Sequence, residues 1–135
     1  MERYDIIVIG SGPGGYVAAI RAAQCGKRVA IVEKADAGGV CLNWGCIPTK
    51  ALVRSAQVYA DCKAAATYGV AVEGEVKADW AKMVERERMV ATTMNKGVQF
   101  LLKKNNIDLL TGFGSLKAAN IVDVDGVEYE AGNII

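Results

Sequence analysis

Hydrophobic residues form two short continuous runs near the start of the chain. Residues 5–10 read Asp-Ile-Ile-Val-Ile-Gly, and residues 28–33 read Arg-Val-Ala-Ile-Val-Glu. Continuous runs of β-branched residues indicate strands buried on both faces, as in a parallel sheet. The intervening residues 16–24 predict a helix that ends near Gly26, since glycine commonly follows the last helical turn. The small-residue face of this helix, which would lie close to the sheet, comprises Ala18, Ala19, Ala22 and Ala23.

Two longer stretches have the period of amphipathic helices. Residues 48–63 place apolar side chains on one side, and residues 80 to about 104 repeat them at intervals of three, four and seven. Asp79 is the expected N-cap of the second helix. Its apolar face comprises Met83, Val84, Ala91, Met94, Val98, Leu101 and Leu102, with the methionines as core filler. The charged residues Lys82, Glu85, Arg86, Glu87 and Arg88 are expected to form a solvated face.

The remaining apolar residues predict short strands. Residues 107–111 read as one strand that ends in Gly-Phe-Gly, and residues 120–130 predict a hairpin around Asp125-Gly126. Residues 133–135 are apolar again and predict the start of another strand. Because no turn follows that strand, we expect the chain to be the first part of a longer protein.

Composition narrows the class of protein. The chain has 135 residues, 52% of them hydrophobic, which fits one domain with a buried core, or part of one. Its net charge is +1, so no basic field is available to attract nucleic acid or anionic lipid. No signal peptide is visible, and no run approaches the roughly 20 apolar residues of a membrane span. We therefore expect a cytoplasmic protein without nucleic-acid or membrane partners.

The first strand leads directly into a glycine-rich turn. Gly10-Ser11-Gly12-Pro13-Gly14-Gly15 contains the pattern G-x-G-x-x-G between a strand and a helix, the context that dinucleotide binding requires. In such a unit the first glycine permits the turn, the second lets the backbone approach a pyrophosphate, and the third allows helix–strand packing. Glu33 ends the second strand, where an acid accepts hydrogen bonds from ribose hydroxyls. An acid there favours FAD or NAD over NADP.

A second glycine-rich segment carries two cysteines. Residues 38–50 read Gly-Gly-Val-Cys-Leu-Asn-Trp-Gly-Cys-Ile-Pro-Thr-Lys, with Cys41 and Cys46 near the start of the helix predicted from about residue 48. A helix N-terminus lowers the pKa of a thiol, so the pair is predicted to be redox-active. The alternatives are a structural disulfide, two unreactive thiols, or a zinc site. We expect no metal site, because the remaining Cys25 and Cys62 fit small core residues better than ligands.

These motifs resemble the amino-terminal part of the FAD-dependent pyridine nucleotide–disulfide oxidoreductases. The resemblance rests on residues 10–15, Glu33 and the block of residues 39–50. It implies an α/β fold, namely a Rossmann-like FAD-binding domain over residues 1–135 with a parallel sheet and a small antiparallel β element. That domain would be incomplete relative to the family, with the NAD-binding and dimerisation domains absent. In the complete enzyme a homodimer is expected.

The resemblance also implies roles for individual residues. Cys41 would be the interchange thiol that attacks the substrate, and Cys46 the thiol beside the flavin. Glu33 would bind the adenosine ribose, Lys50 would lie near the reactive edge of the isoalloxazine, and Gly114 would offer a backbone contact near the adenine. From the residues alone, Gly114 fits a plain turn equally well. The expected cofactor-binding residues are Gly10, Gly12, Pro13, Gly14, Gly15, Glu33, Lys34, Gly39, Val40, Cys41, Lys50 and Gly114.

The implied reaction passes electrons from a dithiol through FAD to NAD. The expected substrate is the lipoyl group of a 2-oxo acid dehydrogenase or glycine cleavage complex, with relatives that reduce glutathione or mercuric ions as alternatives. Val40 stands where the family more often has threonine, and Trp44 where it usually has a smaller residue. Because the chain has no histidine and no second G-x-G-x-x-G, we expect it to be inactive alone. A non-catalytic flavin-binding fragment is the other interpretation.

Overall fold

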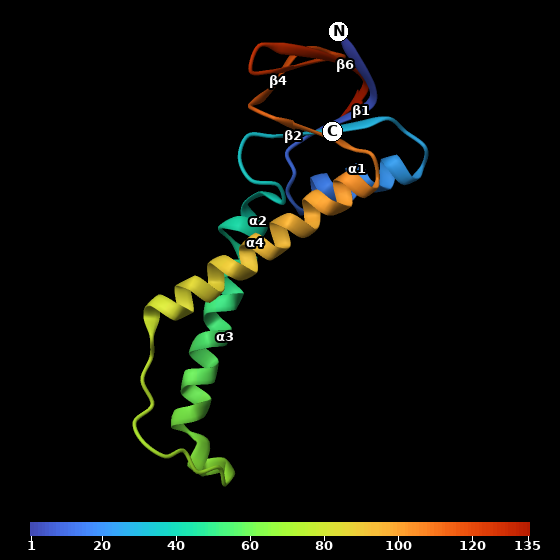
Figure 1. The fold of residues 1–135 in the computed structure, drawn as a ribbon. Helices are drawn as coiled ribbons and strands as arrows, with labels where there is room; N and C mark the ends of the chain where they lie inside the picture. The colour runs from blue at the N-terminus through green and yellow to red at the C-terminus, as the bar shows by residue number, and fades with distance from the viewer.

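A six-stranded sheet lies toward one end of the computed structural model, which describes all residues from Met1 to Ile135 (Figure 1). The spatial order of the strands is β3-β2-β1-β6-β5-β4. Their bounds are β1 Glu2–Ile9, β2 Val29–Glu33, β3 Asp108–Thr111, β4 Gly114–Ala118, β5 Ile121–Val124 and β6 Val127–Ile134. The helices are α1 Pro13–Gln24, α2 Gly39–Asn43, α3 Cys46–Lys63, the 3-10 turn η1 Ala65–Tyr68 and α4 Trp80–Lys104.

The first half of the sheet is parallel. β1 pairs with β2 and β2 pairs with β3, with Val8 opposite Ile31 and Ile31 opposite Leu109. Helix α1 connects β1 to β2, and α4 leads back into β3. This β-α-β arrangement confirms the predicted α/β fold with a Rossmann-like parallel sheet.

Strand β6 joins the parallel half to an antiparallel half. It runs parallel to β1 and antiparallel to β5, which in turn pairs with β4. The predicted hairpin around Asp125-Gly126 is therefore confirmed. The prediction of a separate strand beginning at residue 133 is wrong, because residues 133 and 134 continue β6 and pair with β1. Strand β4 was not predicted.

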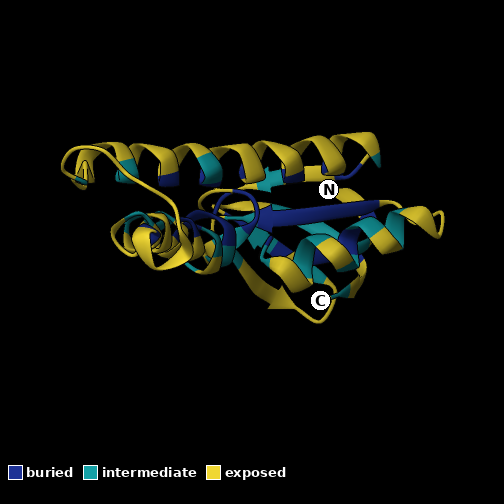
Figure 2. Cartoon of the chain, turned by 90° about the horizontal axis from the view of Figure 1, so that it is seen from below, coloured by how far each residue is buried: buried dark blue, intermediate teal, exposed yellow.

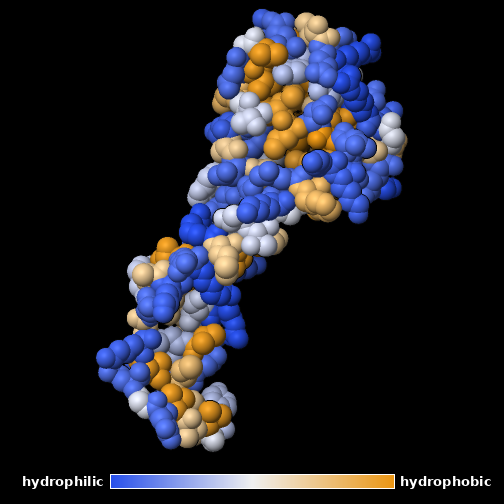
Figure 3. Space-filling view, viewed as in Figure 1, coloured by the Kyte–Doolittle hydropathy of each residue, from blue (hydrophilic) through white to orange (hydrophobic).

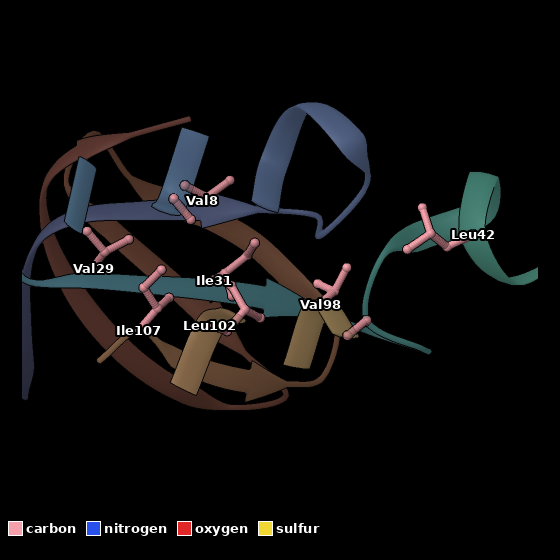
Figure 4. Packing of buried hydrophobic residues seen from close by; sticks show 9 residues of the cluster. Val8, Val29, Ile31, Leu42, Val98, Leu102 and Ile107 are labelled. Atoms are coloured by element: carbon pink, nitrogen blue, oxygen red, sulfur yellow. The ribbon is translucent and has the colours of Figure 1, made fainter. Parts of the chain in front are cut away.

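Both faces of β1 and β2 are covered. On one face Val8, Val29 and Ile31 pack against Val98, Leu102 and other residues of the nine-residue cluster shown in Figure 4. On the other face Ile7, Ala30 and Val32 pack with Val122 and Val124 of β5. Alternate residues of β2 thus point into two separate cores, which explains its unbroken apolar sequence.

Helices α3 and α4 extend beyond the sheet as a helical arm, defined here as residues 52–86 (Figure 1). Exposed positions dominate the arm, and buried ones concentrate around the sheet (Figure 2). Helix α4 begins where predicted, with the Asp79 carboxylate accepting from the Lys82 N–H at 3.1 Å. Patches of apolar surface nevertheless run along the arm (Figure 3). No helix has the length and apolarity needed to cross a membrane.

Several burial predictions for the helices are wrong. Glu87, placed on the solvated face, is 5% exposed, and its carboxylate accepts hydrogen bonds from the half-exposed guanidinium of Arg88. Met94, predicted as core filler, is 42% exposed and is not part of the core cluster that contains Val98 and Leu102. Cys25, predicted as a core residue, is exposed because it is the C-cap of α1.

Candidate functional site

In the glycine turn after β1, the backbone at the start of α1 comes very close to the backbone at the end of β1. Gly10 has φ +100°, a conformation that favours glycine, and its N–H donates to the Val32 carbonyl at 2.8 Å. A Cβ on Gly15 would lie 1.9 Å from the Gly10 carbonyl oxygen. Only glycine therefore allows α1 to pack this closely on the strand, which is the geometry expected of the third glycine in the pattern.

The N-terminus of α1 is open to an anion. Its N-cap, Gly12, provides no side-chain hydrogen bond, and the first turn contains no acidic residue. Pro13 stands at the first helical position, where its missing N–H is no loss. The remaining free N–H groups and the positive end of the helix dipole suit a phosphate.

Glu33 at the end of β2 is connected to this turn through Ser11. The N–H and hydroxyl of Ser11 donate to Glu33 Oε2 at 3.0 and 2.6 Å, and the Ala35 N–H donates to Oε1 at 3.0 Å. Partial burial raises the pKa of Glu33, but the hydrogen bonds from Ser11 and the following backbone outweigh it and hold the pKa below its ordinary value. Glu33 is thus a fixed carboxylate beside the glycine turn.

The cysteine-bearing segment lies directly against the glycine turn. The Ser11 hydroxyl accepts from the Gly38 N–H at 3.0 Å. Gly39 has φ +67°, and a Cβ there would lie 2.7 Å from the Gly12 Cα. The two glycine-rich segments therefore touch through their backbones, at a place where residue 39 could not carry a side chain.

Cys41 and Cys46 lie on two consecutive helices. Cys41 is inside the short helix α2, which was not predicted, and Cys46 is the first residue of α3. Between them, a Cβ on Gly45 would lie 3.0 Å from the Val40 carbonyl oxygen and 3.2 Å from the Cys41 Cα. Gly45 thus allows the chain to return closely enough for the two thiols to meet. Cys41 is half-buried and Cys46 is exposed.

The two thiols interact with each other. A hydrogen bond to Cys46 raises the pKa of Cys41, with burial adding to the shift and the charge of Lys50 opposing it. The expectation that the following helix lowers the pKa of both thiols is therefore wrong for Cys41. It lies inside α2 rather than at the start of α3, and its neighbouring thiol dominates.

Other residues of the expected site lie at the ends of β1 and β2 and along α2 and α3. Gly114 lies over the ends of β1 and β2, since a Cβ there would be 2.9 Å from Val32 Cγ1 and 3.3 Å from Ile9 Cγ2. The Lys34 ammonium lies 5.9 Å from the centre of the Phe113 ring. Lys50 is exposed one turn into α3, and Val40 is exposed on α2. Trp44, directly after α2, is 52% exposed.

Four residues that support the site were not singled out from the sequence. Ser11 occupies a variable position of the glycine pattern, and Asn43 lies between the cysteines without an evident role. Arg88 and Asn95 come from α4, more than 40 residues after Asn43, yet both hydrogen-bond to it. Polar residues on an otherwise apolar helix face were the available signal for Asn95, whereas nothing in the pattern distinguished Arg88 from other surface charges.

Comparison with known proteins agrees with this arrangement. A family model described as pyridine nucleotide-disulphide oxidoreductase matches residues 4–135. The chain is 51% identical over 134 residues to a dihydrolipoyl dehydrogenase of Acholeplasma laidlawii, covering 99% of this chain and 40% of the relative. It is 56% identical over 115 residues to the Rhizobium etli dihydrolipoyl dehydrogenase, covering 85% of this chain and 24% of the relative. The chain thus spans less than half the length of these curated relatives, and it belongs to the pyridine nucleotide-disulphide oxidoreductase family.

Proposed function

We propose that residues 1–135 form the FAD-binding part of a dihydrolipoyl dehydrogenase. The observation that carries this proposal is the backbone contact between Gly12 and Gly39, which puts the cysteine segment beside the pyrophosphate-binding turn. A dinucleotide on that turn would extend toward the thiols. Relatives named dihydrolipoyl dehydrogenase support the choice of activity.

The residues present fit FAD. The turn of residues 10–15 offers free backbone N–H groups to the diphosphate, and Glu33 still has acceptor capacity for ribose hydroxyls beside its bonds to Ser11 and Ala35. The adenine side of the site would be formed by Lys34 and Gly114. Gly39, Val40, Cys41 and Lys50 would line the path to the isoalloxazine. When bound, the flavin would supply the two-electron acceptor next to Cys46.

The two cysteines would carry out thiol–disulfide exchange. In the oxidised pair, one substrate thiolate attacks the Cys41 sulfur and forms a mixed disulfide with it, and Cys46 leaves as a thiolate. The second substrate thiol then displaces Cys41, so that the substrate becomes a cyclic disulfide and the protein a dithiol. Two electrons and two protons pass from substrate to protein.

The complete enzyme would pass the electrons on to NAD and would act on lipoyl groups of 2-oxo acid dehydrogenase or glycine cleavage complexes. The NAD-binding and dimerisation domains and the homodimer belong to the proposal for that complete enzyme, as does a cytoplasmic location. A relative acting on glutathione or mercuric ions shares the same dithiol chemistry, so a substrate panel separates these possibilities.

The spectrum of the purified protein tests the proposal. We expect flavin absorbance, and a long-wavelength charge-transfer band after one equivalent of dithionite has reduced the disulfide. Cys46→Ser should abolish that band while flavin remains bound, whereas Cys41→Ser should keep it. Cys62→Ser, at the far end of α3, is the matched control and should behave as wild type. Absence of flavin after reconstitution would contradict the proposal, whereas bound flavin without lipoamide oxidation by residues 1–135 is expected.

A further inference from the structure

A set of side-chain hydrogen bonds from α4 reaches the segment around the first cysteine. The Asn95 Nδ2 donates to the Ala37 carbonyl at 2.8 Å and to Asn43 Oδ1 at 3.2 Å. Asn95 is in turn fixed by Gln99, whose Nε2 donates to Asn95 Oδ1 at 2.6 Å. Both asparagines are buried, so these bonds are protected from competition with water.

Asn43, which is hydrogen-bonded to Asn95, also hydrogen-bonds to the backbone that precedes Cys41. Its Nδ2 lies within hydrogen-bonding distance of three carbonyl oxygens, those of Asp36 at 3.3 Å, Ala37 at 3.0 Å and Gly39 at 2.9 Å. The first two carbonyls belong to the loop that enters α2, and the third belongs to the first residue of α2. A short helix of five residues has little stability of its own. Its conformation therefore depends on such external hydrogen bonds.

Arg88 holds the other end of α2. Its Nη2 donates to the Asn43 carbonyl at 2.9 Å, one of the carbonyls that a helix end leaves without a partner. Its guanidinium is oriented by two hydrogen bonds to the Glu87 carboxylate, from Nε at 2.6 Å and from Nη2. Because Glu87 is buried and paired, Arg88 is held in one orientation. Asn43 and Arg88 thus fix residues 36–43 from both ends.

From this geometry we propose that Arg88 and Asn95 are positioning residues for the Cys41–Cys46 pair. They hold α2 in the conformation that keeps the two sulfurs within reach of each other when both are reduced. The inference rests on the proposed function, because it assumes that the two cysteines form a redox couple. It assigns to α4, a helix outside the cysteine motif, control over the equilibrium of that couple.

The expected consequence follows from effective concentration. Closing a disulfide between two thiols that are already held together costs less conformational freedom than closing one in a mobile loop. Loosening α2 should therefore leave the dithiol form freer and the disulfide relatively less stable. A fall of about tenfold in the equilibrium constant for disulfide formation makes the reduction potential about 30 mV less negative.

The test is an equilibrium between the protein dithiol and oxidised dithiothreitol. The reaction yields the Cys41–Cys46 disulfide and reduced dithiothreitol, with two electrons and two protons passing to the reagent. Acid quenching and alkylation, followed by mass spectrometry, measure the oxidised fraction of the purified protein without an activity assay. We expect Arg88→Gln to lower the equilibrium constant about tenfold. Asn95→Ala, which changes no charge, should shift it in the same direction.

Arg86 provides the matched control. It lies on the same helix and also donates to a backbone carbonyl, that of Ala51 at 3.1 Å, but this carbonyl lies in α3 beyond both cysteines. Arg86→Gln should leave the equilibrium constant within about twofold of wild type, a shift below about 10 mV. Circular dichroism of each variant, with and without reductant, checks that the fold is retained.

The outcomes separate this inference from the proposed function. If the wild-type pair never forms a disulfide in any ratio of reagent, the proposed function fails. If wild type forms it and Arg88→Gln and Asn95→Ala both behave as Arg86→Gln does, the positioning role is wrong. A shift in Arg88→Gln alone would overturn it in favour of a purely electrostatic effect. Should Arg88→Gln fail to fold, the double variant Glu87→Gln/Arg88→Gln avoids an unpaired buried carboxylate and gives the same comparison.

Discussion

The sheet with α1 and the helical arm are built from equally apolar sequence but bury it very differently. Val8, Ile31 and Leu102 around the sheet are almost completely covered, whereas Val53 on α3 is 60% exposed and Trp80 on α4 is 66% exposed. Helical period alone predicted α3 and α4 correctly as helices. It did not predict burial, because burial requires an opposing surface, and the arm has only two helices to offer each other.

The candidate site lies where these two regions meet. The glycine turn and Glu33 belong to the sheet, whereas α3, which begins at Cys46, continues into the arm. A rigid nucleotide-binding turn is thereby joined to a dithiol whose surroundings depend on polar contacts with α4. Close backbone packing and the hydrogen bonds of Ser11 fix the half of the site beside the sheet, whereas hydrogen bonds from α4 fix the segment that carries the first cysteine.

The largest expected difference between the regions is in the effect of cavity-forming substitutions. Ile31→Ala removes a fully buried side chain and should lower the free energy of unfolding by about 3 kcal/mol. Val53→Ala, on the arm, should change it by less than about 0.5 kcal/mol, because that side chain is mostly in water. Urea denaturation followed by circular dichroism measures both. Equal losses would mean that the arm is as well packed as the sheet.

A second comparison lies within the glycine turn itself. Gly15→Ala places a methyl group against the Gly10 carbonyl, and should lower the free energy of unfolding by about 2 kcal/mol and weaken flavin binding. Gly14→Ala, one residue earlier, meets no atom within 4 Å and should be neutral or stabilising by up to about 1 kcal/mol. Thermal denaturation and flavin titration distinguish the two variants. Similar behaviour would contradict the close crossing of turn and helix.

A third comparison concerns local stability at the far end of the arm. Asp79→Ala removes the N-cap of α4 and should destabilise its first turn by about 1 kcal/mol. Hydrogen exchange should quicken at the first amides of α4 and stay unchanged in β1 and β2, because the arm can open without disturbing the sheet. Glu85→Gln, an exposed residue on the same helix, is the control. Faster exchange in the sheet would show that the two regions unfold together.

The sequence predictions were accurate where the signals are local, and they failed where an element depends on residues distant in sequence. The β-α-β unit was predicted because each of its signals is local: the apolar run of β1, the glycine pattern and the acid that ends β2. The strand from residue 133 was misassigned because β6 lies between β5 and β1, and its pairing with β1 continues to residue 134, beyond the end of its pairing with β5. Helix α2 was missed because its stability comes from Asn95 and Arg88, which are distant in sequence. Contacts between residues distant in sequence produce no periodic pattern along the chain.

The smallest expected effect is the pH dependence that Glu33 contributes where the sheet meets the cysteine segment. Hydrogen bonds from Ser11 lower the pKa of Glu33 in the folded protein. The carboxylate therefore contributes stability that is fully present above the unfolded pKa of about 4.3 and is lost as the pH falls through the lower folded pKa. Glu33→Gln should flatten this part of the profile, measured as urea midpoints between about pH 3 and pH 6. Ser11→Ala removes one of the two Ser11 donors and should flatten it partly; a steeper loss in acid would reverse the sign and contradict the assignment.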